Sequence, residues 1–228
     1  MSATSTFQPA VRIQTSVLAD LEKRLLVFLA HRLPSGVNSD HLTILGAAAM
    51  GGAGAAFWIG GAHPHALFAV PLMLALNWLG DSLDGTLARV RRQERPRYGY
   101  YVDHVLDAGG IGLLTTGLIL GGFLTQTTGL AFLSAYYLLM IDIALAAHAR
   151  GEFRMTFWRI GPTELRIVLA CGALMLLQSP TVSLFGLTCG LFDVGAWIAF
   201  AGLFLTFAVS AIANGRALYR EERCRARP

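Results

Sequence analysis

The sequence is short of charge. Only 14% of its 228 residues are Asp, Glu, Lys or Arg, whereas a soluble domain carries about 25%. Hydrophobic residues make up 54% of the chain, and its mean hydropathy is +0.54. This composition excludes a soluble globular domain and a disordered chain.

Cysteine is also scarce. Cys171, Cys189 and Cys224 are an odd number without paired spacing, which excludes a disulfide framework and a zinc site. The 25 glycines follow no G-X-Y period, which excludes collagen. A compact helical membrane protein is the class that remains.

Long apolar runs are abundant. About 20 apolar residues are needed to cross the hydrocarbon core of a bilayer. We expect an all-α integral membrane fold with six transmembrane helices, at Leu42–Gly61, His65–Ala88, Val105–Leu124, Gly129–His148, Leu165–Gln178 and Val194–Asn214.

The 18 basic residues lie in alternate connections, with Arg166 just inside the fifth run. They precede the first run, separate the second from the third and the fourth from the fifth, and follow the sixth. The connections around His63, Gln126 and Thr181 contain no Lys or Arg. Since positive residues stay on the cytoplasmic side, we expect both termini to be cytoplasmic. The net charge of +4 then describes a basic rim facing anionic lipid headgroups rather than a nucleic-acid surface.

Residues 1–36 predict an N-terminal amphipathic helix. Its apolar residues recur at helical spacing, with charged residues on the other side: Leu18, Leu21, Leu25 and Phe28 against Asp20, Glu22, Lys23 and Arg24. Such a helix lies in the membrane interface or packs on the protein, and both interpretations stay open.

Two further parts follow this helix. We expect residues 37–215 to form the six-helix transmembrane domain and residues 216–228 a basic cytoplasmic tail. The first span is rich in small residues: Gly46, Ala47, Gly51, Gly52 and Gly54. Small residues let helices approach closely, within one chain or at the seam of a homodimer.

Four aspartates interrupt the apolar pattern. Asp81 and Asp84 end the second span, and Asp103 and Asp107 open the third. Each pair is three or four residues apart and so shares a helix face. The short connection makes the two helices antiparallel neighbours, which can gather the four carboxylates near the cytoplasmic boundary. Ionised groups at membrane depth are costly and indicate function.

Four clustered carboxylates repel one another unless a cation neutralises them. Oxygen ligands suit Mg²⁺ or Mn²⁺, and two ions about 4 Å apart would clamp a phosphoryl group. Gly85 would let a phosphate approach the backbone, and Arg89 offers a fork for it. The alternative is a salt-bridge rim with Arg89, Arg91 and Arg92.

These residues belong to a longer pattern, Asp81-x2-Asp84-Gly85-x2-Ala88-Arg89-x9-Gly99-x3-Asp103-x3-Asp107. It resembles the signature of the class-I CDP-alcohol phosphatidyltransferases and departs from it only by one extra residue between Arg89 and Gly99. Asp40-His41-Leu42-Thr43 is similar to the family's entry into its first span, with Ser39 in place of the usual proline.

The resemblance implies a metal-dependent transfer in phospholipid synthesis. An acceptor hydroxyl would attack the phosphorus of a CDP-linked donor and release CMP. The resemblance assigns metal binding to Asp81, Asp84, Asp103 and Asp107, with Asp107 also the general base. It assigns the CDP site to Asp81, Asp84, Gly85, Ala88, Arg89 and Gly99.

The donor is less well defined. Asp103-His104 and Thr163-Glu164 resemble the choline/ethanolamine phosphotransferase branch, which tilts the expectation to CDP-choline or CDP-ethanolamine with diacylglycerol. CDP-diacylglycerol with a polar alcohol is the alternative, since the chain is much shorter than the enzymes of that branch.

Other polar residues are weaker candidates. His104 could share the proton transfer. Asp142 and Glu164 could hold a cationic headgroup, or Asp142 could pair with His148 or Arg150. A phosphorylated acceptor could be bound by arginines that positive-inside topology also explains: Arg150, Arg154, Arg159 and Arg166.

Two other classes of function compete with an enzyme. A divalent-cation transporter would need polar groups along a transmembrane path, whereas here the carboxylates gather at one end. A non-catalytic membrane scaffold would not need four intact aspartates.

Overall fold

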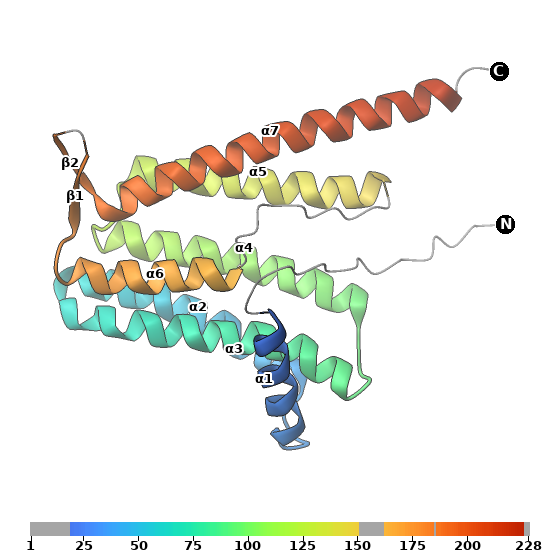
Figure 1. Cartoon of the computed structure of the whole chain (residues 1–228), viewed down its shortest axis with the longest axis horizontal. Helices are drawn as coiled ribbons and strands as arrows, with labels where there is room; N and C mark the ends of the chain where they lie inside the picture. Colours follow the sequence, from blue (N-terminus) through green and yellow to red (C-terminus); the bar gives the residue numbers. More distant parts are fainter. Residues whose placement is uncertain (1–18, 151–161, 185, 226–228) are drawn as a thin grey trace.

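The computed structural model describes residues 19–150, 162–184 and 186–225. The chain is mostly helical, as expected. The elements follow in the order α1 (Ala19–Arg32), α2 (Ser39–Ala62), η1 (Pro64–Phe68), α3 (Ala69–Val90), α4 (Pro96–Leu120), α5 (Gln126–Arg150), α6 (Pro162–Leu176), β1 (Thr181–Leu184), β2 (Leu187–Gly190) and α7 (Leu191–Arg225). Helices α2 to α7 run along the long axis of the molecule, and α1 crosses them near one end (Figure 1).

Each of the six predicted spans coincides with one of the helices α2 to α7. Within the described ranges, four segments are long and apolar enough to cross a membrane: Ser39–Ala62, Pro64–Val90, Gln126–Ala149 and Leu191–Arg223. Helix α6 has only 15 residues. Helix α4 has 25, but its aspartates and glycines dilute the apolar residues. The protein is an integral membrane protein, and the count of six spans stays a prediction.

Local sequence signals explain where these helices begin and end. Asn38 caps α2 through a hydrogen bond from the His41 backbone N–H to Asn38 Oδ1 (3.0 Å). Pro96 occupies the first turn of α4. Helix α3 ends in a Schellman arrangement, in which Arg92 takes φ 54° and the Gln93 N–H donates to the carbonyl of Ala88. The connection between α3 and α4 is therefore short, as expected.

Helix α2 packs backbone to backbone against both α3 and α4. A Cβ atom on Gly80 would lie 2.6 Å from the backbone nitrogen of Gly46, and one on Gly54 would lie 2.6 Å from the Leu113 carbonyl oxygen. The small residues of α2 thus serve contacts within one chain. These contacts lie within one chain and do not test the homodimer, which stays a prediction.

The main core lies where α2, α3 and α4 meet. Its largest fully buried side chains include Phe57, Leu67, Leu74 and Leu114. The ring of Phe57 meets that of Phe192 edge-on, with centroids 5.5 Å apart, and this contact ties α7 to the core. Many apolar side chains on the outer faces of α5 and α7 are exposed, as lipid-facing surfaces require.

Helix α1 packs on α3, but with a different face from the expected stripe. Leu26 and Ala30 are buried in a second small core, whereas Leu25 and Phe28 are 45% and 50% exposed. Glu22, expected on the outer polar side, accepts a hydrogen bond from the indole N–H of Trp78 at 2.9 Å. Leu18 and the side chain of Leu21 lie outside the described residues. The interfacial location of α1 stays a prediction.

The connection between α6 and α7 contains a hairpin that the sequence pattern did not predict. Strands β1 and β2 pair antiparallel from Thr181 opposite Gly190 to Leu184 opposite Leu187. Gly186 has φ +83°, a left-handed conformation that favours glycine. Helix α7 then continues without a break across residue 215, where the basic tail was expected to begin.

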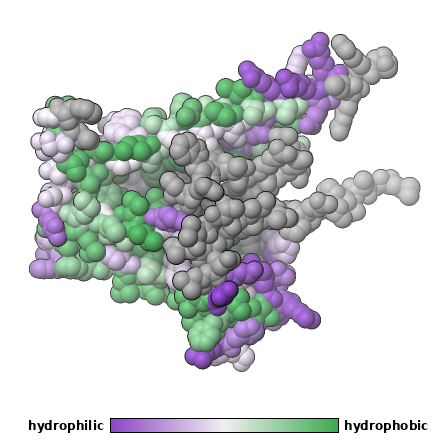
Figure 2. Space-filling model, in the orientation of Figure 1, coloured by the Kyte–Doolittle hydropathy of each residue, from purple (hydrophilic) through white to green (hydrophobic). Residues whose placement is uncertain are grey.

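The two ends of the molecule differ in character. The hairpin lies at one end, and the last turns of α7 and the connection between α3 and α4 lie toward the other (Figure 1). Hydrophilic residues gather over α1 and the last turns of α7 in Figure 2, while hydrophobic residues cover much of the coloured surface between them. This separation agrees with helices that cross a bilayer.

Two glycines of α4 provide a matched test of the close packing. A Cβ atom on Gly117 would collide with the carbonyl oxygen of Gly54, whereas one on Gly109 would meet nothing within 4 Å. We expect Gly117→Ala to destabilise the protein by about 1–3 kcal/mol, because the backbones must separate. Gly109→Ala should stay within about 1 kcal/mol of the wild type. Thermal unfolding in detergent measures both, and equal effects of the two variants would contradict the packing.

Candidate active site

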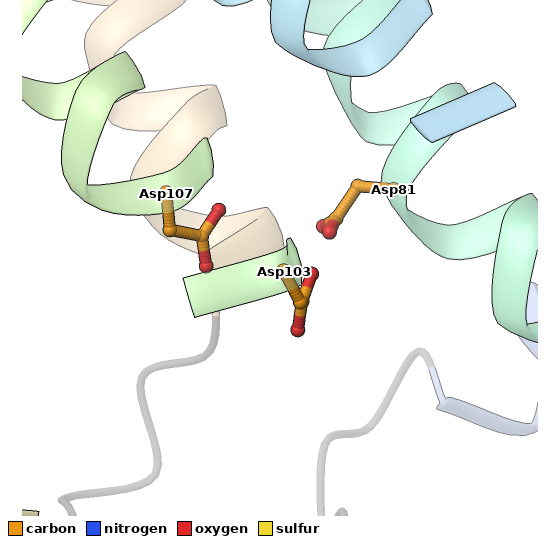
Figure 3. Close-up of side chains that lie close together, drawn as sticks. All are labelled: Asp81, Asp103 and Asp107. Carbon is orange, nitrogen blue, oxygen red and sulfur yellow. The ribbon is translucent and has the colours of Figure 1, made fainter. Parts of the chain in front are cut away.

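Three of the four aspartates meet at one point. Asp81 comes from α3, and Asp103 and Asp107 come from α4; one carboxylate oxygen of each lies within 4.8 Å of the others. In Figure 3 the three side chains converge on the space between the two helices. Asp107 is exposed and the other two are half-buried, so the cluster is reachable from outside.

The cluster opens into a pocket between α2, α3 and α4. All four aspartates line it, together with Thr43 and Asn77. Its remaining lining is apolar or small: Gly46, Ala47, Met50, Leu106 and Gly110. The pocket therefore has an acidic wall, made by α3 and α4, and an apolar wall to which α2 contributes most.

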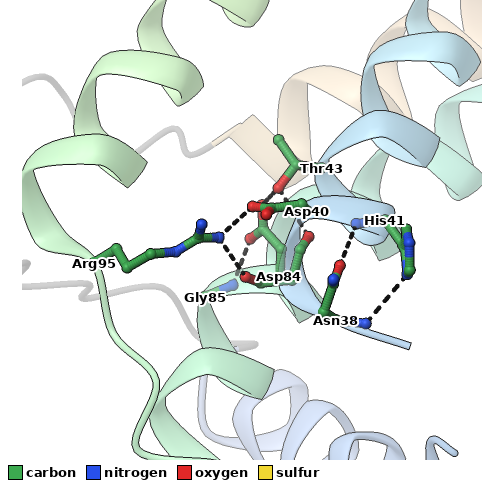
Figure 4. Close-up of polar contacts among 8 residues, drawn as sticks. Asn38, Asp40, His41, Thr43, Asp84, Gly85 and Arg95 are labelled. Atoms are coloured by element: carbon green, nitrogen blue, oxygen red, sulfur yellow. Dashed lines mark hydrogen bonds and ion pairs between the residues drawn. The ribbon is translucent and has the colours of Figure 1, made fainter. Parts of the chain in front are cut away.

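Asp84 lines the pocket but lies outside the group of three. Its Oδ2 accepts a hydrogen bond from the Thr43 hydroxyl at 2.6 Å, and its Oδ1 accepts one from the Gly85 backbone N–H (Figure 4). The Thr43 hydroxyl also lies 3.0 Å from the carbonyl of Ser39. The first turn of α2 thus holds Asp84 in place, which gives Thr43 a defined role in the site.

Asp81 is held from the opposite side by Arg166 of α6. A guanidinium Nη2 donates to Asp81 Oδ2 at 2.7 Å, and Nε donates to the amide oxygen of Asn77 at 2.7 Å. The amide nitrogen of Asn77 in turn donates to the Gly46 carbonyl at 2.9 Å. Arg166 was expected at the acceptor, so its contact with a candidate metal ligand is a feature that sequence reasoning missed.

In the salt-bridge alternative, the arginines after Asp84 pair with the aspartates. In the structure, two of these arginines have other partners. Arg89 donates to the Thr86 hydroxyl at 3.1 Å. Arg91 donates to the carbonyls of Leu33 and Pro34, at 3.1 and 3.0 Å, and so caps the end of α1. The contacts of Arg89 and Arg91 therefore do not support the salt-bridge alternative.

Arg95 pairs with Asp40 at the start of α2. The guanidinium donates to the Asp40 carboxylate (Figure 4) and lies 4.5 Å from the centre of the Tyr98 ring. The hydrogen bond to the Asp40 carboxylate raises the pKa of Arg95 above its ordinary value. This exposed pair connects the α3–α4 loop to α2 beside the site.

Of the residues expected at the CDP site, Asp81 and Asp84 line the pocket, whereas the other four are not among its lining residues. Gly85, Ala88 and Arg89 follow Asp84 on the last two turns of α3, and Gly99 lies in the first turn of α4. Nothing lies within 4 Å of a Cβ atom placed on Gly99, so open space adjoins the backbone there.

His104 and Asp142 are held by neighbours outside the pocket lining. His104 Nδ1 lies 2.8 Å from the Tyr100 carbonyl, and the rings of the two residues are tilted by 36° with centroids 4.1 Å apart. Asp142 accepts a hydrogen bond from Ser210 of α7 at 2.5 Å, and Asn214 donates to Ser210 at 3.2 Å. Asp142 thus has a polar partner across the α5–α7 contact, while the side chain of Arg150, one of the two partners that the sequence suggested, lies outside the described residues.

The remaining acceptor candidates are only partly described. Glu164 lies in the first turn of α6, two residues before Arg166. Arg154 and Arg159 lie outside the described residues, and so does the side chain of Arg150.

The carboxylates fit a hard divalent cation. Three oxygens within 4.8 Å of one another, with a fourth carboxylate on the same pocket, form an oxygen-only ligand set. Mg²⁺ and Mn²⁺ prefer such ligands and complete their shells with water or substrate phosphate. The pocket leaves one side of the cluster open for such a substrate.

Comparison with known proteins relates this geometry to a family. The family model for CDP-alcohol phosphatidyltransferase matches residues 38–208. Among solved structures, the chain is similar to phosphatidylinositol phosphate synthase of Mycobacterium tuberculosis with CDP-DAG bound, at 23% identity and a TM-score of 0.62. The match covers 86% of this chain and 94% of that one. None of the curated proteins matches the chain.

Proposed function

Since the chain belongs to the CDP-alcohol phosphatidyltransferase family, we propose that its aspartate cluster is the centre at which a CDP-linked donor reacts with an acceptor hydroxyl. The protein is a membrane-embedded transferase of substituted phosphate groups that acts in phospholipid synthesis. Membership of a transferase family favours an enzyme over a cation transporter or a non-catalytic scaffold as the reason for the four aspartates.

One observation carries the proposal. Asp81, Asp103 and Asp107 bring three carboxylate oxygens within 4.8 Å of one another in the lining of a pocket that Asp84 also lines. Such a group of like charges is unfavourable without a cation. Bound Mg²⁺ or Mn²⁺, as one ion or two, would stabilise the charge that develops on the donor's pyrophosphate.

The chain's own residues would divide the work as follows. Asp81, Asp84, Asp103 and Asp107 would hold the cation, and the Thr43 hydroxyl fixes the orientation of Asp84. The acceptor oxygen forms a new bond to the phosphorus distal to cytidine, the pyrophosphate P–O bond breaks, and CMP leaves. Asp107, the exposed member of the cluster, takes the proton of the attacking hydroxyl. Gly85, Ala88, Arg89 and Gly99 contact the departing nucleotide at the ends of α3 and α4.

For the donor we favour CDP-diacylglycerol. The neighbour solved with CDP-DAG bound matches over 94% of its length, so the two chains are of similar extent. The pocket also continues from the acidic wall into apolar side chains such as Ala47, Met50 and Leu106, which suit a donor that carries acyl chains. The acceptor is then a polar alcohol.

CDP-choline or CDP-ethanolamine with diacylglycerol is the alternative that the sequence favours. It relies on His104 and Thr163-Glu164, with Asp142 as a second carboxylate for the cationic headgroup. In the structure Asp142 contacts Ser210 on α7, and neither it nor His104 is among the described residues that line the pocket. These placements give the alternative less support than its sequence features suggested.

The basic residues orient the protein in the membrane. Helix α1, the α3–α4 connection and the end of α7 carry many of the described arginines. We place both termini, and the aspartate cluster with them, on the cytoplasmic side. The last turns of α7 then form the basic cytoplasmic segment, and the exposed Leu25 and Phe28 of α1 reach the membrane interface.

The role of Asp107 can be separated from metal binding. Asp107→Asn keeps an oxygen ligand but removes the proton acceptor, so we expect CMP release to fall about 100-fold or more. Mn²⁺ binding should persist. It is measured from the electron paramagnetic resonance signal of the free ion. Glu221→Gln, an exposed carboxylate change on α7, is the control and should keep full activity. Undiminished turnover in Asp107→Asn would refute the base assignment.

The donor is decided by a labelling panel. Radiolabelled CDP-diacylglycerol, CDP-choline and CDP-ethanolamine are each offered with Mg²⁺ or Mn²⁺. The first is paired with serine, glycerol 3-phosphate or inositol 1-phosphate, and the other two with diacylglycerol. We expect label in phospholipid only from CDP-diacylglycerol, because the pocket suits an acylated donor. Incorporation only from an aminoalcohol donor would reverse the donor assignment and leave the reaction class unchanged.

The orientation is tested with single cysteines. Gln93→Cys and Gln126→Cys place a thiol in the α3–α4 connection and at the start of α5, after Cys171, Cys189 and Cys224 are replaced by serine. In intact cells an impermeant maleimide should label only Gln126→Cys, because the basic connection is cytoplasmic. Gln93→Cys should react after permeabilisation. Labelling of both in intact cells would contradict the orientation.

A further inference from the structure

Arg166 is a charged side chain held inside the helix bundle. It comes from α6, the shortest of the helices α2 to α7, and its side chain is only 13% exposed. Burying a guanidinium is costly unless its donors are satisfied and its charge is balanced. Both conditions are met, by Asn77 and Asp81, at 2.7 Å each.

Asn77 presents a fixed acceptor to this arginine. It is 7% exposed, and its amide nitrogen donates to the Gly46 carbonyl, so its oxygen is turned toward Arg166. The contacts form one chain from the α2 backbone through Asn77 and Arg166 to Asp81. Three helices thereby determine the direction of one carboxylate.

The guanidinium geometry matters for this arrangement. Nε and Nη2 are two donors in one rigid plane, and each reaches a different acceptor on α3. A lysine has the charge but not the planar fork, so it cannot reproduce both contacts with the same geometry. Asn77 and Asp81 are four residues apart and lie on one face of α3, which suits this two-point contact.

We propose that Arg166 is a positioning residue, which holds Asp81 toward Asp103 and Asp107 and balances part of their charge, and that it is not a contact for the acceptor. The inference rests on the proposed function, since it assumes that the cluster binds a divalent cation. Two of the arginine's donors are already engaged inside the bundle, and little of its surface is open to a substrate.

The sign of an electrostatic effect follows from this role. A guanidinium 2.7 Å from Asp81 repels any cation that shares that carboxylate. Its removal should therefore tighten cation binding in the absence of substrates, while catalysis weakens because Asp81 loses its fixed direction. A residue that only stabilised the fold would not produce this opposite pair of changes, and the loss of an acceptor-binding residue would raise the KM of the acceptor.

The experiment uses the full chain in detergent micelles, with Mn²⁺ alone as the probe. We expect Arg166→Gln to bind Mn²⁺ roughly three- to tenfold more tightly than the wild type, by electron paramagnetic resonance titration. Its kcat for CMP release should fall about tenfold or more. Its KM should stay within about twofold for whichever of serine, glycerol 3-phosphate and inositol 1-phosphate the wild type uses best.

Two matched variants complete the design. Arg166→Lys keeps the charge without the fork, so it should bind Mn²⁺ as the wild type does and have an intermediate kcat. Arg220→Gln removes one positive charge from the exposed end of α7 and should change none of the three quantities. If Arg166→Gln does not fold, Arg166→Lys decides alone. A lowered kcat at unchanged acceptor KM supports the inference, and a raised KM at unchanged kcat overturns it.

The results of this experiment distinguish a failure of the positioning role of Arg166 from a failure of the proposed metal centre. Unchanged or weaker Mn²⁺ affinity in Arg166→Gln, in a protein whose wild type binds Mn²⁺, overturns the positioning role alone. A wild type that binds no Mn²⁺ overturns the metal centre of the proposed function, and the positioning role with it.

Discussion

The close approach of α2 to its two neighbours is the constraint on which the site depends. Gly46 and Gly80 let the backbones of α2 and α3 touch beside Asp81, and Gly54 and Gly117 do the same for α2 and α4 farther along. Because no side chain separates these helices, the aspartates of α3 and α4 face one narrow space. A larger residue at any of these contacts would move the helices apart and open the ligand set, so fold stability and site geometry depend on the same atoms.

The acidic site also requires charge control. Four carboxylates line one pocket in a chain that has only 14% charged residues. Two hydrogen-bond donors reduce this repulsion. The neutral Thr43 hydroxyl donates to Asp84, and the cationic Arg166 donates to Asp81. Both come from helices other than the one that bears the aspartates they hold. The ligand set is therefore directed by tertiary contacts, and a divalent cation would complete a balance that these contacts begin.

The positions of the helices, and the shared helix face of each aspartate pair, could be predicted because both depend on local spacing. Apolar length located the helices α2 to α7, and the three- and four-residue intervals put each aspartate pair on one helix face. Spacing along a chain does not say which face of a neighbour a side chain meets. The expected stripe of α1 therefore left out Leu26 and Ala30, which are buried, and Arg166 and Asp142 have partners on α3 and α7 that no local pattern links to them. The β1–β2 hairpin was missed because its strands have only four residues each, which is too short for a periodic pattern to indicate a strand.

The same distinction explains why the aspartate pattern identifies the reaction before it identifies the substrates. In the proposed reaction its residues would serve the parts that every CDP-linked donor shares, namely the pyrophosphate and the departing CMP. What differs between donors must be recognised elsewhere, by the apolar wall of the pocket or by residues beyond α4. The described polar side chains of α5, α6 and α7 already serve internal contacts in several cases, as Arg166 and Asp142 do. Substrate choice in this chain would then rest more on the shape and depth of the pocket between α2 and α4 than on a charged residue dedicated to the headgroup, and such a preference leaves little trace in a linear motif.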